Sequence, residues 1–341
     1  MAAYAAVATR STAKIIINFM MYDLAASLYI FIGRPDCMHM LFFAPMNLVG
    51  NCLYRHFLLK RGADYVFSEL IRMDRVREEF TKEKHRIISG DEDRTIMQIG
   101  AATEEEIDQG VKLFPHSEIN LNMCCPHSTL VQNNRCGGIL KQPALMRRLC
   151  MHLARSRDNA SVKIRLGPSM DDIRVDEYLR IIQDSGLRKV FIHARTLRHP
   201  YHKPAFYAPL QDIQRRFPGL HIVINGDIDS YDAAMQAMEY TGCKDIMIGR
   251  AALMNPDVFR QIRDQIPAKT ERYDPLRNDI SQDRLARVRE LICLAGPDTR
   301  IEPLKANIIY LLKGSGYDTT AIYGAKTLKS LREHINHTDA L

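Results

Sequence analysis

Short apolar runs alternate with segments of helical period along the chain from Met40 onward. The runs that read as strands are Leu41–Ala44, Tyr65–Ser68, Ile96–Ile99, Ile119–Asn122, Val162–Arg165, Val190–His193, Ile222–Ile224 and Ile246–Ile248. The segments between them that read as helices include Glu104–Leu113, Pro143–Arg155, Asp176–Ser185 and Tyr231–Tyr240. This alternation is typical of repeated βα units, and eight such strands predict a closed (β/α)₈ TIM barrel of the α/β class.

The strand pattern stops after Pro256, and the rest of the chain has only helical periodicity. The segments Arg284–Leu294, Pro303–Leu312 and Ala325–Ile335 predict a small C-terminal helical domain. We therefore expect an N-terminal extension over residues 1–39, a barrel over residues 40–265 and a helical domain over residues 276–341.

The N-terminal extension is the part that the pattern defines least. Ile15–Gly33 is largely apolar and is interrupted by Asp23, so it lies at the limit of about 20 apolar residues that a membrane helix needs. Met1–Met20 contains basic and hydroxyl residues and no acid, as a transit peptide would. The favoured reading is an amphipathic or buried extension, or a gene-start artefact. We expect a cytoplasmic protein without stable membrane association, with a mitochondrial location as the alternative.

Composition narrows the class of protein. The chain has 341 residues, of which 46% are hydrophobic and 26% charged, which suits one large and one small globular domain. Lys and Arg outnumber Asp and Glu by 47 to 40, so a polyanionic partner is permitted but not required. The eight cysteines form no CxxC pair, which indicates a reducing compartment and no metal. Zinc at Cys124, Cys125 and Cys136 is disfavoured because adjacent cysteines are poor tetrahedral ligands.

Polar residues stand at the ends of several predicted strands. In a (β/α)₈ barrel these ends converge on one face, where ligands bind. Gly249-Arg250 offers backbone N–H groups and a positive charge for a phosphate, and Asn225-Gly226-Asp227 ends the preceding strand. The two motifs together predict a phosphate site.

Three polar residues lie inside strands that are otherwise apolar. Burying Lys163 or His193 without partners would cost several kcal/mol, on the order of 2–7, so we expect both to face a ligand, together with Gln98. A flavin ring suits this set because it gains negative charge on reduction. Cys125, in the loop after its strand, is a candidate acid, although a free cysteine is more often a small buried hydrophobe.

The order of these motifs along the chain is APM, QIG, LNMCCP, GG, VKIR, HART, NGDI and IGRAALMNP. From about Phe42 to about Pro256 it resembles the tRNA-dihydrouridine synthase family. The blocks Leu121–Pro126 and Ile248–Pro256 are the most specific, and Arg61–Glu69 has the character of the family's eukaryotic branches.

The resemblance implies an FMN-binding barrel and a helical domain that grips tRNA, in a protein that we expect to be a monomer. The FMN-binding residues that it implies are Pro45, Met46, Asn47, Gln98, Lys163, His193, Asn225, Gly226, Asp227, Gly249 and Arg250. It places the substrate contacts at Asn122, Arg195, Arg198 and Tyr201, with Lys203 beside them.

The implied reaction reduces the C5–C6 bond of a uridine in tRNA. NADPH reduces FMN, FMN passes a hydride to C6, and Cys125 protonates C5 of a uracil lifted out of its stack. Which uridine is modified depends on how the helical domain orients the whole tRNA, which the sequence does not define.

The chain also departs from the family's pattern. Cys124 stands where the family usually has Gly, Asn47–Asn51 replaces the usual residues after APM, and the segment after Pro126 lacks the common lysines. These departures keep open a catalytically degenerate member that acts as an RNA-binding or assembly factor. A separate alternative is an FMN barrel oxidoreductase with a small-molecule substrate.

Overall fold

The computed structural model describes residues 39–76, 91–265, 280–297 and 299–337. Its contacts divide the chain into two units, Met1–His39 and Met40–Leu341. Residues 1–38 lie outside the described residues, so the readings of the N-terminal extension stay predictions. None of the helices in the described part of the chain has both the length and the apolar composition that a membrane crossing requires.

Eight parallel strands form a closed barrel, as predicted. They are β1 (Leu41–Phe43), β2 (Tyr65–Phe67), β4 (Thr95–Gly100), β5 (Ile119–Met123), β6 (Ala160–Arg165), β7 (Lys189–His193), β8 (His221–Asn225) and β9 (Asp245–Ile248). The barrel closes because β1 pairs with both β2 and β9, while β2 also pairs with β4. The short β3 (Ile71–Arg72) adds one further pairing beside β4.

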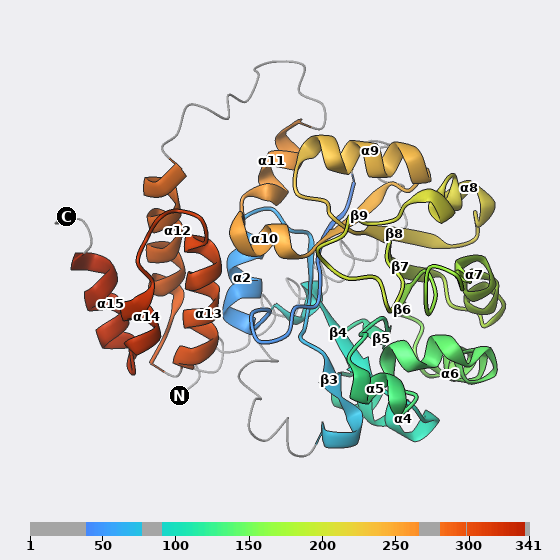
Figure 1. Ribbon diagram of the computed structural model, residues 1–341. Coiled ribbons are helices and arrows are strands. Elements are labelled where there is room, and N and C mark those ends of the chain that lie inside the picture. The colour runs from blue at the N-terminus through green and yellow to red at the C-terminus, as the bar shows by residue number, and fades with distance from the viewer. Residues whose placement is uncertain (1–38, 77–90, 266–279, 298, 338–341) are drawn as a thin grey trace, which may run out of the picture. The chain divides into compact units, whose positions relative to one another are not determined.

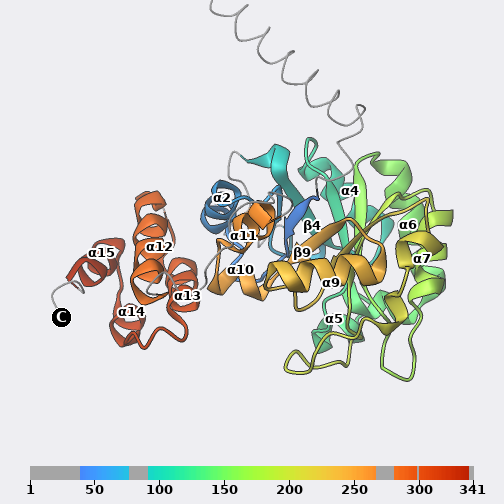
Figure 2. The same ribbon diagram turned by 90° about the horizontal axis from the view of Figure 1, so that it is seen from above.

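Helices follow the strands and pack on the outside of the sheet (Figures 1 and 2). They are α2 (Cys52–Lys60), α4 (Glu104–Leu113), α5 (Ser128–Gln132), α6 (Pro143–Ser156), α7 (Val175–Asp184), α8 (Ile213–Arg216), α9 (Tyr231–Thr241), α10 (Arg250–Met254) and α11 (Val258–Gln265). The four barrel helices predicted from periodicity appear within one residue of their expected bounds. Three of the helices have a side-chain N-cap. Asn51, Thr103 and Ser230 accept hydrogen bonds from backbone N–H groups in the first turns of α2, α4 and α9.

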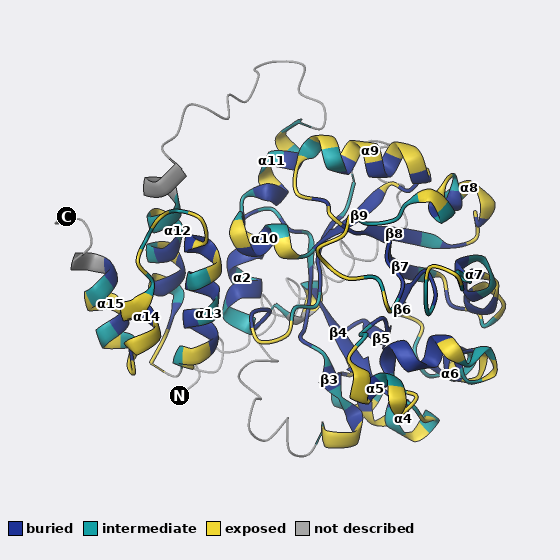
Figure 3. Ribbon diagram, in the orientation of Figure 1, coloured by how far each residue is buried: buried dark blue, intermediate teal, exposed yellow. Residues whose placement is uncertain are grey.

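The strands bury side chains on both faces, which is why they read as nearly continuous apolar runs (Figure 3). Outward-facing side chains pack under the helices in one large cluster. A second, smaller cluster fills the middle of the barrel with Phe42, Ala44, Phe67, Ile96, Phe191, Val223 and Met247. The ring of Phe191 meets Phe42 and Phe67 edge-on at centroid distances of 5.1 and 4.9 Å. The barrel is therefore a packed core with no open channel at this level.

A lysine closes the amino-terminal end of the barrel. The Nζ atom of Lys189 lies 2.8 Å from the carboxylate of Glu118 and within 5.2–5.6 Å of the ring centroids of Phe42, Tyr65 and Phe191. Ser161 donates a second hydrogen bond to Glu118 at 2.5 Å. The ammonium group is held by a buried carboxylate and by aromatic faces together.

The C-terminal helices are α12 (Ile280–Leu294), α13 (Ile301–Leu312), α14 (Thr320–Gly324) and α15 (Leu328–His337). The third predicted helix was expected from Ala325, but α15 begins three residues later. Ala325 instead ends α14 in an extended conformation, and Lys305 donates hydrogen bonds to the carbonyls of Tyr323 and Ala325.

Buried polar contacts join these helices to the barrel. Asn307 on α13 accepts a hydrogen bond from Asn51 at 2.8 Å and donates one to the carbonyl of Val49 at 2.8 Å. Arg61, at the end of α2, pairs with Asp257 and with Glu290 on α12. The loop after β1 and the C-terminal helices therefore share one set of hydrogen bonds.

Replacing Lys189 with Met tests the closure of the barrel. Lys189→Met keeps the apolar stem but leaves Glu118 buried without its cation, so we expect the free energy of unfolding to fall by about 2–4 kcal/mol in urea titration. The double variant Lys189→Met/Glu118→Gln should recover part of this loss. Lys112→Met, at an exposed position of α4, is the matched control and should stay within about 0.5 kcal/mol of the parent. Equal stability of Lys189→Met and this control would refute the role of the pair.

Candidate functional site

The carboxyl ends of the strands place a layer of polar side chains above the apolar centre of the barrel. The register aligns Asn122 on β5 with Lys163 on β6, and His193 on β7 with Asn225 on β8. All four residues are buried. Because side chains alternate between the two faces of a strand, these residues share the inner face with the apolar centre below them. The structure thus brings together predicted site residues from four consecutive strands.

A chain of amide hydrogen bonds organises one side of this layer. Asn122 donates from Nδ2 to the Gln98 side-chain oxygen at 2.7 Å, and Gln98 donates to Asn120 at 2.9 Å. The oxygen of Asn122 accepts the backbone N–H groups of both Cys124 and Cys125 at 2.9 Å. Gln98 is thus held inside the barrel wall, and the contact predicted between Gln98 and a cofactor stays a prediction.

Cys125 occupies the half-buried start of the loop that follows β5. Its carbonyl accepts the N–H of Gly137 at 3.1 Å, and a side chain at Gly137 would come within 2.5 Å of that carbonyl. This close approach explains the glycine and fixes the loop against the 3₁₀ helix Cys136–Lys141. Burial raises the pKa of the Cys125 thiol, so the group keeps its proton at neutral pH and can act as an acid.

Lys163 lies buried between two partners. Its Nζ atom donates to the side-chain oxygen of Asn225 at 3.1 Å and to the sulfur of Cys124 at 3.5 Å. Burial lowers the pKa of Lys163, while the nearby Cys124 opposes that effect. An ammonium group carries three N–H donors, so one remains for a ligand.

His193 is held as a neutral ring. Arg195 can only donate, and its NH1 lies 3.1 Å from Nε2 of His193, so this ring nitrogen is the acceptor and Nδ1 carries the proton. Burial, followed by the charges of Lys163 and Arg165, holds the pKa of His193 well below its usual range. The ring therefore offers an N–H donor without a positive charge.

Asp227 forms ion pairs with Arg195 and Arg250, which follow β7 and β9. It accepts hydrogen bonds from Arg195 at 2.6 and 2.8 Å and from Arg250 at 2.7 Å, and also from the N–H of Ala205 at 2.7 Å. Burial alone would raise the pKa of Asp227, but the hydrogen bond from Arg195 and the other partners outweigh it and lower the pKa. One carboxylate thus balances only part of the local positive charge.

Gly226 and Gly249 border this charged group. Gly226 has a φ of +142°, and a side chain there would approach Ala205 and Ala194 at 3.1 and 3.3 Å, so the turn requires glycine. Gly249 begins α10 without a side-chain cap, beside the sulfur of Met46. Both predicted glycines therefore lie at the mouth of the barrel.

The side chain of Tyr201 is exposed on this face of the barrel. Its ring lies 5.3, 5.7 and 5.4 Å from the guanidinium carbons of Arg165, Arg195 and Arg250, and its hydroxyl accepts a hydrogen bond from Arg165 at 2.8 Å. Tyr201 is 49% exposed, whereas Arg195 is 1% exposed. Arg198 and Lys203 are also exposed in the same loop.

Sequence reasoning did not include Arg165 and Cys124 among the site residues. Arg165 stands two residues after Lys163 on β6, and this period of two on one strand face was the signal that could have identified it. Its Nε atom donates to the Cys124 carbonyl at 2.9 Å and its NH1 to the Thr196 carbonyl at 2.7 Å. It thereby joins the ends of β5, β6 and β7.

The loop after β1 completes the mouth. The carbonyl of Met46 accepts the N–H of Gly50 at 2.7 Å, and Arg55 donates to the Gly50 carbonyl at 2.8 Å. Pro45 and Met46 are half-buried, and Asn47 is exposed. Whether these three predicted residues contact a cofactor stays a prediction.

The donors at this face fit a flavin mononucleotide. Lys163 has a free N–H, the Nε atom of Arg195 is buried without a hydrogen-bond partner among the described residues, and the arginines around Asp227 leave an excess of positive charge for a phosphate. In the described ranges, no group of three or more His, Cys, Asp and Glu side chains is placed to hold a metal ion.

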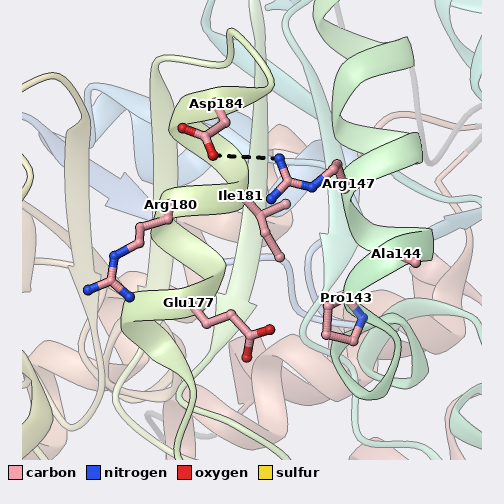
Figure 4. A pocket seen from close by; sticks show the side chains of 7 residues that line it. All are labelled: Pro143, Ala144, Arg147, Glu177, Arg180, Ile181 and Asp184. Atoms are coloured by element: carbon pink, nitrogen blue, oxygen red, sulfur yellow. Dashed lines mark ion pairs between the residues drawn. The ribbon is translucent and has the colours of Figure 1, made fainter.

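A separate pocket of about 290 Å³ lies on the outside of the barrel, between α6 and α7 (Figure 4). Arg147 and Asp184 form an ion pair of 3.5 Å across it. None of its lining residues belongs to the polar layer at the strand ends, so it is not the candidate site.

The comparisons with known proteins point to the same family as the order of the motifs along the chain. The chain matches the family model described as "Dihydrouridine synthase (Dus)" over residues 42–338. It is 26% identical over 282 residues to the "Probable tRNA-dihydrouridine synthase" of Aquifex aeolicus, covering 80% of this chain and 86% of that protein. It is 27% identical over 242 residues to "tRNA-dihydrouridine synthase B" of Shewanella oneidensis, covering 68% and 73%.

The protein of the same name from Escherichia coli K12 is 26% identical over 268 residues, covering 77% of this chain and 80% of that protein. These three relatives are bacterial, so the expected likeness to the eukaryotic branches stays a prediction. The family match, in contrast, runs from β1 to the end of α15 and includes every described barrel strand. The chain therefore belongs to the dihydrouridine synthase family.

Proposed function

We propose that the protein is an active tRNA-dihydrouridine synthase that uses FMN and NADPH to reduce the C5–C6 bond of uridine in tRNA. The observation that carries this proposal is the family match over residues 42–338, which covers both the barrel and the C-terminal helices. The donor set at the strand ends supports the flavin, and the protonated thiol of Cys125 supports the reduction of a carbon–carbon double bond.

Different residues of the chain would bind the ring and the phosphate of the flavin. FMN, when bound, supplies the hydride. Lys163 and His193 are residues of the polar layer that each have an N–H donor, with which they would stabilise negative charge on the ring. Gly226 and Gly249 let the backbone come close to the phosphate, and Arg250 supplies its counter-charge.

Cys125 would deliver the proton to C5 of the uracil. Burial keeps this thiol protonated, and the hydrogen bonds of Asn122 and Gly137 hold its backbone in place. An acid that is positioned in advance loses little freedom when the base arrives. The base must leave its stack to enter the barrel mouth.

The exposed side chains around the mouth suit a nucleic acid. Tyr201 offers an aromatic face for a base, and Arg198 and Lys203 beside it offer positive charge for phosphates. Arg195 is buried against Asp227, so in this structure it supports the site from within. The C-terminal helices, with Tyr310 and Tyr323 exposed, would hold the body of the tRNA.

A catalytically inactive RNA-binding role is the alternative. The replacement of the family's Gly by Cys124 is the observation that favours it, since this thiol meets Lys163 within the site. Retention of the Cys125 thiol, and of Lys163, His193 and Asn225 in one layer, favours the enzyme.

One experiment separates these readings. The purified protein is examined for a flavin absorption spectrum, with and without added FMN, and is then incubated with NADPH and unmodified tRNA. Nucleoside mass spectrometry should detect new dihydrouridine. A protein that binds tRNA but retains no flavin and forms no dihydrouridine would contradict the proposal and support the RNA-binding role.

The variant Cys125→Ala should retain flavin and tRNA binding but lose product. Removing a general acid typically lowers the rate by about 10²–10⁴-fold, and we expect a loss in this range in single-turnover formation of dihydrouridine. Cys293→Ala, at an exposed cysteine of α12, is the matched control and should keep the parent rate. Full activity of Cys125→Ala would remove this residue from the mechanism.

The raised pKa of Cys125 predicts a particular pH profile. An acid works in its protonated form, so the rate falls as pH rises through the pKa of the thiol. An ordinary thiol titrates at about pH 8.5, and we expect the alkaline fall in dihydrouridine formation to lie above that value. The residual rate of Cys125→Ser should lack this fall, because a serine hydroxyl does not titrate in the range. A fall centred below pH 8 in the parent would contradict the assignment.

A further inference from the structure

Two adjacent cysteines follow β5, and the proposed reaction uses only the second. The first, Cys124, is buried at 7% exposure, and its sulfur lies 3.5 Å from the Nζ atom of Lys163. The proposed acid, Cys125, is half-buried and has no such partner among the described residues. Cys124 is therefore a nucleophilic group within the site that the proposed chemistry leaves unused.

The backbone directs the two thiols into different surroundings. Asn122 lies on the inner face of β5, and its side-chain oxygen bonds the N–H groups of both cysteines, which turns the chain at the barrel mouth. Arg165 then holds the carbonyl of Cys124 at 2.9 Å, while Gly137 holds the carbonyl of Cys125 at 3.1 Å. One thiol is fixed beside the charged ends of β6, and the other beside the 3₁₀ helix.

The charges around the two thiols differ in the same way. Burial raises the pKa of any thiol, but at Cys124 the positive charges of Lys163 and Arg165 outweigh burial and lower the pKa. At Cys125 burial prevails and the pKa is raised. Of the other groups near Cys124, Cys136 and Tyr201 have raised pKa values and stay protonated. His193, which lies near Lys163, stays neutral.

We propose that Cys124 is a positioning residue of the flavin site, which pairs as a thiolate with the Lys163 ammonium and so sets the charge that Lys163 presents to the flavin. The second half of this proposal rests on the proposed function, whereas the pair itself does not. Lys163 is then anchored between a sulfur on β5 and an amide oxygen on β8. The pair has no net charge, so it offers a hydrogen bond to the flavin with less positive potential than a lone lysine.

The pair can be tested in protein without flavin. The ultraviolet absorbance of thiolate is followed against pH in the parent and in Cys124→Ser, and the difference gives the titration of Cys124 without any reagent reaching the buried sulfur. We expect this titration below that of an ordinary thiol, because Lys163 and Arg165 lower the pKa of Cys124. In the Lys163→Met background the same difference titration should move up by at least one pH unit. Circular dichroism checks that each variant is folded, and Lys163→Gln replaces Lys163→Met if the latter is not.

The flavin half of the proposal needs the loaded protein. Removal of the thiolate in Cys124→Ser leaves Lys163 with uncompensated positive charge, which favours the reduced, anionic form of FMN. We expect the ratio of affinities for reduced over oxidised FMN to rise about tenfold, equivalent to a midpoint potential about 30 mV higher for a two-electron couple. Cys150→Ala removes a buried thiol of α6 outside the barrel and is the matched control, with no expected shift.

The outcomes are separable. A Cys124 titration that does not respond to Lys163→Met overturns the pair, even in a protein that binds FMN and forms dihydrouridine. A responsive titration with an unchanged potential in Cys124→Ser overturns the assignment of Cys124 as a positioning residue for the flavin. Failure to bind FMN contradicts the proposed function and the flavin half together, while the titration still decides whether the pair exists.

Discussion

The side-chain amide of Asn122 determines how the chain leaves β5, and the chemistry at the barrel mouth depends on it. Its oxygen bonds two successive backbone N–H groups, and its nitrogen bonds Gln98 within the barrel wall. An amide oxygen has two lone pairs, so both are occupied and the turn has one conformation. Cys124 and Cys125 therefore point into separate environments although they are neighbours in the sequence. A hydrophobic side chain at this position would leave two N–H groups without acceptors.

The two ends of the barrel balance their charges differently. At the amino-terminal end, Lys189 is paired with Glu118, and His221 lies 2.5 Å from Asp245. At the carboxyl-terminal end, Asp227 alone serves both Arg195 and Arg250, while Arg165 is bonded to carbonyl oxygens and to Tyr201. Buried charges are costly unless they are paired, so the ion pair of Lys189 with Glu118 suits stability, while the two arginines that share Asp227 suit an anionic ligand.

The strands and the main barrel helices could be predicted from the sequence because each depends on local periodicity. The ends of the strands converge on one face of a (β/α)₈ barrel, which is why Lys163, His193 and Asn225 could be expected there from the sequence. The helix expected at Ala325 begins later because Lys305, 20 residues away, bonds the carbonyl of Ala325. Such a contact between distant positions leaves no periodic signal.

The sequence also predicted which residues come together in the site. Residue types at strand ends indicated which side chains would meet, but not how they share hydrogen bonds. Gln98 was expected to face a ligand, and the structure gives it two amide partners inside the barrel. Arg165 could have been identified from its spacing of two residues from Lys163 on β6. The importance of Cys124 depends on its distance from Lys163, which becomes known only once the sheet has closed.

The hydrogen bonds between Asn307 and the loop after β1 limit how this protein can be recombined with its relatives. Asn51 both begins α2 and bonds α13, and the carbonyl of Val49 is satisfied by the same asparagine. A chimera whose C-terminal helices had no asparagine at the position of Asn307 would leave those groups buried without partners. The boundary for a functional exchange therefore does not coincide with the connector between the barrel and the helices. A graft must carry the loop at residues 49–51 along with the helices, as one inherited unit composed of two distant stretches of chain.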